Sequence, residues 1–377
     1  MRFCNNRKIF MILFILFMGF SMTSCSFISD NDIKIGILGK LSGEFTDWGK
    51  GTRDGIIHAV KECNDSGGIH SRRIRVIIKD VKKYNNLEKA IDEFVKDGVD
   101  IVLGPSTSST AMKIVPFVNK KKVLLFSGSA STIELLGKDD YFFRSVHNDK
   151  DIAAILAEFL FKKRGWKNIR SAWSTVNRSS RKGWHDSFKK KIEELGGKVI
   201  CVGMFETKED LSKIEKGLLS EKCDGVFLCG GYKEIGKLIQ SLKKSAPKIE
   251  IAINSGAALQ NSPEYFGKPG EHVFTAKPYF KNMESPEYVS FHKSFLKSYS
   301  YEPGYIALLG YDAGSVMVKA LKGCDKITAD TVKEKIVQIK DFLSPMGKIS
   351  IDRFGDAKRA IHILEIVNGR YVRAKEK

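Results

Sequence analysis

Short aliphatic runs alternate with segments of helical period from residue 33 onward. The aliphatic runs each end in Gly, Ser, Asp or Pro-containing turns and read IKIGIL (33–38), IRVIIKD (74–80), DIVLGP (100–105) and KVLLFSG (122–128). Between them, apolar residues share one helical face, in the sets Ile56, Ile57, Val60, Cys63 and Leu87, Ala90, Ile91, Phe94, Val95. Near-continuous aliphatic strands separated by amphipathic helices are typical of βαβ units. The pattern therefore predicts a parallel sheet covered by helices on both faces.

The same alternation starts again after Phe143. An apolar helical face is followed by a strand near residues 169–174, and three more strands are predicted in VICVGM, GVFLCGG and EIAIN. Helices return at 288–299 and 305–324, and two strand-like runs close the chain between Ser344 and Val372. Two α/β sheets of similar composition predict two lobes with a cleft between them. Since no run of Pro, Gly or Ser marks a loose linker, we expect ordered crossings between the lobes.

The N-terminus has the pattern of an export signal. Three cations, Arg2, Arg7 and Lys8, precede a twelve-residue apolar run, Ile9 to Phe20, which is too short to cross a bilayer as a helix. The following MTSC, ending at Cys25, resembles the lipobox of bacterial lipoproteins, in which the cysteine receives lipid. We expect residues 1–24 to be a lipoprotein signal peptide and residues 25–32 a lipid tether. The alternative is plain cleavage without lipid.

Charge and cysteine content exclude several classes of protein. The formal net charge is +19, and +16 remains without the three signal cations. The lysines gather mostly on predicted helix faces, which indicates solvated surfaces; attraction to anionic lipid or to an acidic partner is the alternative. A nucleic-acid partner is not expected. Of seven cysteines, five remain apart from Cys4 and Cys25, without the even spacing of a disulfide framework or a CxxC metal motif.

Two hydroxyl-rich loops follow neighbouring predicted strands. GPSTSST (104–110) carries five hydroxyls after the strand DIVL, and SGSAST (127–132) follows the strand KVLLF. In open α/β sheets, ligands bind beyond the carboxyl ends of the strands, where helix N-termini offer free amides. The pair predicts a polar cradle suited to a carboxylate or an amide. Ordinary helix capping is the alternative for either loop alone.

The same loops do not have the pattern of a catalytic centre. The chain lacks GxSxG, a Walker A motif and HExxH, and Ser179 to Lys182 matches SxxK without an accompanying KTG. The seven histidines are scattered. We therefore expect a binding protein, with neither an enzymatic activity nor a cofactor or metal.

The sequence resembles a known family, the branched-chain amino-acid (Leu/Ile/Val) type of periplasmic solute-binding protein. The opening IKIGILGKLSGEFTDWGKGTRDGIIHAVKECNDSGGI is similar to the family's start, and further motifs follow in the family's order: GPSTSS, FSGSAST, YFFRSVHND, GGYKEIG, GYDA and a closing G-x-I-x-I-D-x-x-G-D. The resemblance runs from about Ile33 to Tyr371. It implies a type I periplasmic binding fold with three hinge crossings that closes on its ligand. Lobe one would comprise residues 33–148 plus 279–352, and lobe two residues 149–278 plus 353–377.

The resemblance also implies ligand-binding residues in lobe one. Trp48 occupies the family's aromatic place in the first loop. Ser108, Ser129 and Ser131 fall where lobe one binds the α-carboxylate and α-ammonium groups of the ligand.

In lobe two, the sequence departs from its relatives. Tyr232 matches an aromatic wall, and Lys182 falls where an aromatic residue is more usual. The acidic residue that helps to hold the ammonium would follow EIAIN, but Ser255 and Gly256 stand there without a charge, and Ser255 is the ligand contact expected at that place. Backbone carbonyls and Asp149 are the remaining candidates for that role. The ligand therefore stays open between an amino acid, such as a branched-chain one, and an amide, urea or small carboxylate.

Together these features predict a lipid-anchored, monomeric binding protein, exported to the periplasm or outer cell surface of a bacterium. It would deliver a small polar ligand to the membrane permease of an ABC importer. The alternative is a ligand-sensing receptor component that passes its closure to a separate membrane kinase or chemoreceptor.

Overall fold

The computed structural model describes residues 31–43, 46–278 and 285–375. The predicted signal peptide, Cys25 and most of the predicted tether lie outside these residues. Within them, no helix combines the length and the apolar character needed to cross a membrane.

The first sheet contains five parallel strands in the order β2-β1-β3-β4-β5. Its strands are β1 (Ile33–Gly39), β2 (Ile74–Asp80), β3 (Ile101–Leu103), β4 (Leu124–Ser127) and β5 (Phe142–Arg144). The helices between them are α2 (Thr46–Asp65), α3 (Leu87–Lys96) and α4 (Ser108–Lys121), with short 3-10 turns η2 (Val81–Lys83) and η3 (Ile133–Leu135). Every residue of β3 and β4 is buried, as expected for central strands with helices on both faces. The strands predicted from the aliphatic runs are confirmed.

The later part of the chain returns to this first lobe. It adds helices α10 (Pro286–Tyr299), α11 (Tyr305–Lys322) and α12 (Ala329–Val337), and a small antiparallel sheet of β11 (Phe342–Ser344), β12 (Gly347–Ile351) and β13 (Ala357–Lys358). Helix α11 lies along α2, where glycines allow a close approach: a Cβ on Gly55 would lie 2.0 Å from the Ala307 carbonyl oxygen.

The second sheet has seven strands in the order β15-β14-β10-β9-β8-β6-β7. Its strands are β6 (Asn168–Ser174), β7 (Lys198–Phe205), β8 (Gly225–Cys229), β9 (Ile251–Ile253), β10 (Val273–Lys277), β14 (His362–Val367) and β15 (Arg370–Arg373). Strand β14 pairs antiparallel with both β10 and β15, and all other neighbours in the sheet pair parallel. Helices α5 (Asp149–Arg164), α6 (Arg178–Glu194), α7 (Lys208–Leu219), α8 (Tyr232–Ser245) and α9 (Ser262–Phe266), with the turn η4 (Lys268–Gly270), complete this lobe.

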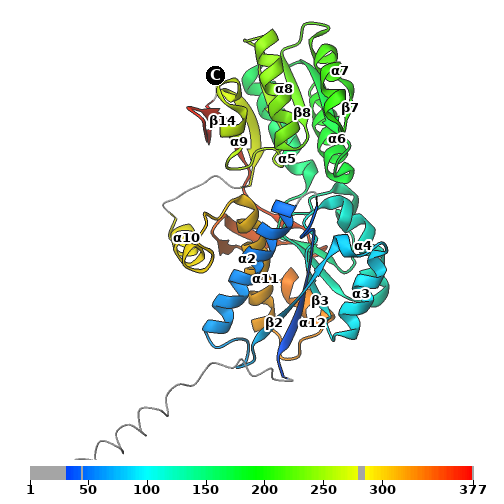
Figure 1. The fold of residues 1–377 in the computed structure, drawn as a ribbon, viewed down its shortest axis with the longest axis vertical. Coiled ribbons are helices and arrows are strands. Elements are labelled where there is room, and N and C mark those ends of the chain that lie inside the picture. Colours follow the sequence, from blue (N-terminus) through cyan, green and yellow to red (C-terminus); the bar gives the residue numbers. More distant parts are fainter. Residues whose placement is uncertain (1–30, 44–45, 279–284, 376–377) are drawn as a thin grey trace, which may run out of the picture.

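The two sheets form two lobes stacked along the long axis of the molecule (Figure 1). The chain passes between them from β5 to α5, from β10 to α10 and from β13 to β14. Because β13 pairs with β12, Ala357 and Lys358 lie in the small antiparallel sheet of the first lobe, whereas the sequence assigned residues from 353 onward to the second lobe. The turn between Asp352 and Asp356 causes this difference, since it folds the chain back on the first lobe before it crosses.

Buried ion pairs tie two of the crossings to the first lobe. Arg144, where the chain leaves β5, pairs with Asp356 at 2.6 Å between Nη2 and Oδ1. Arg359, just after β13, pairs with Asp312 of α11, and both side chains are almost completely buried. These ion pairs hold the two crossing segments close together where they leave the first lobe.

Candidate functional site

The two hydroxyl-rich loops lie side by side at the carboxyl ends of β3 and β4, as predicted, and fasten to each other. The Ser108 hydroxyl oxygen accepts hydrogen bonds from the backbone amides of Ser131 at 3.1 Å and Thr132 at 3.2 Å. In return, the Ser129 hydroxyl donates to the Ser106 carbonyl at 3.1 Å. The two loops therefore form one polar wall, and some of its hydroxyl groups are used in hydrogen bonds within the wall.

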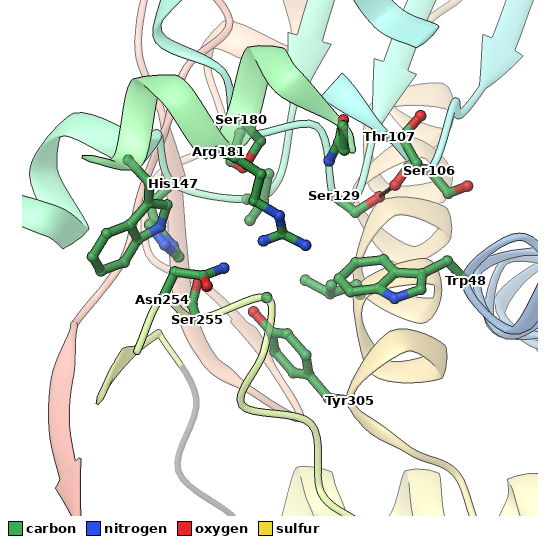
Figure 2. Close-up of a pocket in the computed structure, with 16 residues that line it drawn as sticks. Trp48, Ser106, Thr107, Ser129, His147, Ser180, Arg181, Asn254, Ser255 and Tyr305 are labelled. Atoms are coloured by element: carbon green, nitrogen blue, oxygen red, sulfur yellow. Dashed lines mark hydrogen bonds between the residues drawn. The ribbon is translucent and has the colours of Figure 1, made fainter. Parts of the chain in front are cut away.

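A cavity lies between this wall and the second lobe (Figure 2). Its free volume is about 40 Å³, room for about three water molecules. From the first lobe and the first crossing it is lined by Trp48, Ser106, Thr107, Ser129, Ser131, Val146, His147, Tyr305 and Leu309. From the second lobe it is lined by Asn177, Ser180, Arg181, Trp184, Asn254, Ser255 and Gly256. Polar and aromatic side chains thus converge on it from both lobes.

Arg181 places a guanidinium group in the middle of this space (Figure 2). The residue lies in the first turns of α6 and is only 5% exposed, and its Nε–H has no hydrogen-bond partner within the described residues. Gly256 makes room for it, since a Cβ there would lie 2.7 Å from Arg181 Nη1. A buried Nε–H without a hydrogen-bond partner carries a desolvation cost, which an anionic ligand would offset.

Two further donors in the cavity wall also lack partners. Asn254 Oδ1 accepts from the Gly230 amide at 2.9 Å, which orients the side-chain amide and leaves Nδ2 without a partner in the described chain. Trp184 Nε1 is likewise buried and unmatched. Both atoms can only donate. His147 is neutral near pH 7, because burial, and then the charges of Arg359 and Arg144, lower its pKa to about 3.

Asp149 lies behind the wall and does not line the cavity. Its backbone amide donates to the Ser131 carbonyl at 2.8 Å, and its carboxyl faces the Ser131 and Ser180 hydroxyls. Burial raises the pKa of this carboxyl to about 6, and the hydroxyls and the charges of Arg144 and Arg181 oppose that shift only in part. Among the described residues that line the cavity, none is acidic.

The structure brings together four of the eight residues expected to bind a ligand: Trp48, Ser129, Ser131 and Ser255 line the cavity. Ser108 and Asp149 lie directly behind its wall.

Two expected residues lie elsewhere. Lys182 is exposed and pairs with Asp186, one turn along α6. Tyr232 borders a neighbouring hollow, which it shares with Trp48, Arg181 and Gly256.

The register of α6 explains why Arg181 was missed. Arg181, Trp184 and Phe188 follow one another at helical spacing on the buried face, whereas Lys182 projects about 100° away from Arg181. The apolar residues at 184 and 188 were the signal that could have identified Arg181 as the inward-facing cation. Tyr305 and Asn254 had no comparable signal, because one begins a helix and the other ends a strand far from the two loops in the sequence.

Comparisons with known proteins agree with this architecture. The sequence profile of a periplasmic binding protein family matches residues 32–370. The leucine-, isoleucine-, valine-, threonine-, and alanine-binding protein of Pseudomonas aeruginosa is 22% identical over 329 residues, which cover 86% of this chain and 87% of that protein.

Two solved structures share the fold. The leucine-binding protein LivK of Thermotoga maritima superposes with a TM-score of 0.80 at 22% identity, covering 91% of this chain and 98% of that one. A solute-binding protein of an ABC transporter from Rhodopseudomonas palustris HaA2, in complex with p-hydroxybenzoic acid, gives a TM-score of 0.79 at 20% identity, with coverages of 92% and 96%.

Proposed function

Because this chain belongs to the periplasmic binding protein family, we propose that it captures a small ligand between its lobes and delivers it to an ABC importer. Members of this family bind solutes and are not enzymes. The observation that carries the proposal is the interlobe cavity, in which Arg181 from one lobe faces the hydroxyl-rich wall of the other. A ligand that contacts both sides stabilises the closed arrangement, which is the signal a permease reads.

A melting-temperature screen tests the binding step. The panel contains amino acids, amides, urea and small carboxylates, and a true ligand at a hundred times its dissociation constant adds about 2.7 kcal/mol to the free energy of unfolding. Gly256→Val should abolish that stabilisation by displacing Arg181, whereas Gly304→Ala should not, since a Cβ at Gly304 meets no atom within 4 Å.

Delivery is tested by uptake. A strain without this protein should lose import of the radiolabelled ligand and regain it with the wild-type gene but not with Gly256→Val. Uptake that continues unchanged in the deletion strain would contradict a transport role and favour a sensory one.

We also propose that Cys25 carries lipid and tethers the protein to the membrane. The motif MTSC after a short apolar run supports this. Wild-type protein should enter the detergent phase on phase partition, and Cys25→Ser should stay in the aqueous phase. A wild-type protein that partitions as soluble contradicts the anchor.

A further inference from the structure

The unmatched polar atoms of the cavity specify a ligand more narrowly than the family does. We propose that the site binds a monocarboxylate that lacks an α-ammonium group, with the carboxylate paired to Arg181. This inference rests on the proposed solute-binding function and concerns the class of solute.

The first argument is that donors predominate among the unmatched atoms of the cavity wall. Ser106 Oγ and His147 Nδ1 are also buried there without partners and can donate or accept, whereas three other atoms can only donate. Arg181 Nε, Asn254 Nδ2 and Trp184 Nε1 are all buried and unmatched within the described residues, and none of them can accept a hydrogen bond. A carboxylate has two oxygens with about four acceptor positions, and a guanidinium matches it through two parallel bonds. An amino acid also carries a carboxylate, so these donors require the carboxylate and do not by themselves exclude an α-ammonium group.

The second argument is the absence of a counter-charge for an amine. No acidic side chain is among the described residues that line the cavity. Asp149 Oδ2 is a buried acceptor without a hydrogen-bond partner in the described chain, but Asp149 lies behind Ser131 and Ser180 and outside the cavity lining, so a ligand's ammonium would not contact it directly. An ammonium buried beside Arg181 would meet a like charge and lose its water shell without an ionic partner.

The third argument concerns the rest of the ligand. Away from the donors, the walls are the rings of Trp48, Trp184 and Tyr305 with the aliphatic side chains of Val146 and Leu309. Such a surface favours a compact apolar body, either a flat aromatic ring or a branched aliphatic chain.

Matched pairs of probes isolate the amine and the carboxylate. Calorimetry should compare 4-methylpentanoate with L-leucine and 3-phenylpropanoate with L-phenylalanine, which differ only in the ammonium, and benzoate with benzamide, which differ in the carboxylate. At least one of the carboxylates should bind, and at least tenfold more tightly than its partner in the pair.

Variants then test the role of Arg181. Arg181→Gln should weaken carboxylate binding at least tenfold, while Lys182→Gln, next to it but on the solvent side, should stay within about twofold of the wild type. Gly256→Ala is a second variant that keeps the arginine, and it should weaken carboxylates because its Cβ would crowd Nη1. Melting curves of the ligand-free variants confirm that each is folded.

The outcomes separate this inference from the function on which it rests. An amino acid that binds more tightly than its deaminated partner overturns the carboxylate class and leaves solute binding intact. Equal carboxylate affinity in the wild type and Arg181→Gln also overturns it. If no member of either series or of the wider panel binds, both the class and the solute-binding function are rejected.

Discussion

Arg181 carries a positive charge into a cavity where its Nε–H finds no partner within the described chain. Binding residues of this kind lower the stability of the free protein, because their preferred partner is the ligand. Arg181→Met should therefore melt at a higher temperature than the wild type without ligand. Relief of about 1 kcal/mol of desolvation would correspond to a rise of about 2 °C.

Calorimetric melting of the ligand-free proteins measures this. Arg178→Met is the control, since Arg178 is exposed and lies over the Trp173 ring at 5.5 Å from its centroid. We expect that control to melt at or slightly below the wild-type temperature. A lower melting temperature for Arg181→Met would mean that Arg181 stabilises the free protein.

Asp149 gives the stability a pH dependence of defined sign. Burial raises its pKa to about 6, against an ordinary value of 3.8 in the unfolded chain. Well below pH 3.8 the proton is bound in both states. As the pH rises from 4 to 6 the unfolded state loses its proton first, so this group lowers the free energy of unfolding by about 3 kcal/mol, and the loss is complete above the folded pKa.

Asp149→Asn should remove that dependence. The gain in unfolding free energy over the wild type should grow from pH 4 to pH 7 in urea titrations. Asp186→Asn should show the opposite pH dependence. Burial alone would raise the pKa of Asp186, but hydrogen bonds with Lys182 and His185 hold that pKa below its ordinary value. That variant should lose stability at pH 7, and the loss should shrink as the pH falls. A flat difference for Asp149→Asn would show that its carboxyl is solvated.

At the scale of elements, the seam between α2 and α11 is built on glycines. A Cβ on Gly310 would lie 2.2 Å from the Thr52 carbonyl oxygen, and one on Gly55 would lie 2.0 Å from that of Ala307. Backbone atoms cannot yield as a flexible side chain can, so the helices must separate to admit a methyl group. Gly310 and Asp312 both belong to the GYDA motif, which therefore combines close packing with the buried pair to Arg359.

Gly310→Ala should destabilise the protein by about 1–3 kcal/mol in chemical denaturation, despite the better helix propensity of alanine. Gly304→Ala, at the residue before α11, has open space around its Cβ and should change the stability by less than about 0.5 kcal/mol. Equal stability of the two variants would mean that the seam adjusts at no cost.

The elements could be predicted from the sequence because their signals are local. Aliphatic runs and helical periods located the strands and helices, and the motif order identified the family and the type I fold, which the family match and the shared architecture confirm. The segment after SGSAST forms only the 3-10 turn at Ile133–Leu135, so the second hydroxyl-rich loop, unlike the first, does not lead directly into an α-helix. The cavity was less predictable, since the choice between Arg181 and Lys182 depends on which face of α6 is buried, and Tyr305 joins the site only through packing of the lobes.

At the scale of the whole molecule, the two lobes cap each other's helices. Asn177, at the start of α6, accepts a hydrogen bond at 3.0 Å from the Ser109 amide in the first turn of α4. The Ser109 hydroxyl accepts one in return from the Ser179 amide in the first turn of α6, at 3.3 Å. Each helix N-terminus thus uses a cap from the other lobe, so separation of the lobes exposes amides at both.

The two capping hydrogen bonds between the lobes bear on ligand entry, because the cavity between the lobes is small. The cavity itself has about 40 Å³ free, and the neighbouring hollow of about 290 Å³ shares Trp48, Arg181 and Gly256 with it. A ligand of amino-acid or benzoate size therefore fits the cavity alone only if the lobes or the lining side chains move apart. The reciprocal caps therefore stabilise an arrangement that must open before the ligand binds and that the bound ligand can then hold together.

Removal of one cap should shift the free protein toward the open arrangement. A hydrogen bond contributes about 0.5–1.5 kcal/mol, which changes an open-to-closed ratio by a factor of about 2 to 10. Asn177→Gly keeps the left-handed backbone at φ 54° while it deletes the cap, and its radius of gyration in small-angle scattering should exceed that of the wild type. Asn368→Gly, at φ 52° in the turn between β14 and β15, is the matched control and should leave the radius unchanged. If Asn177→Gly scatters like the wild type, the three crossings alone hold the lobes in place and the caps contribute nothing to closure.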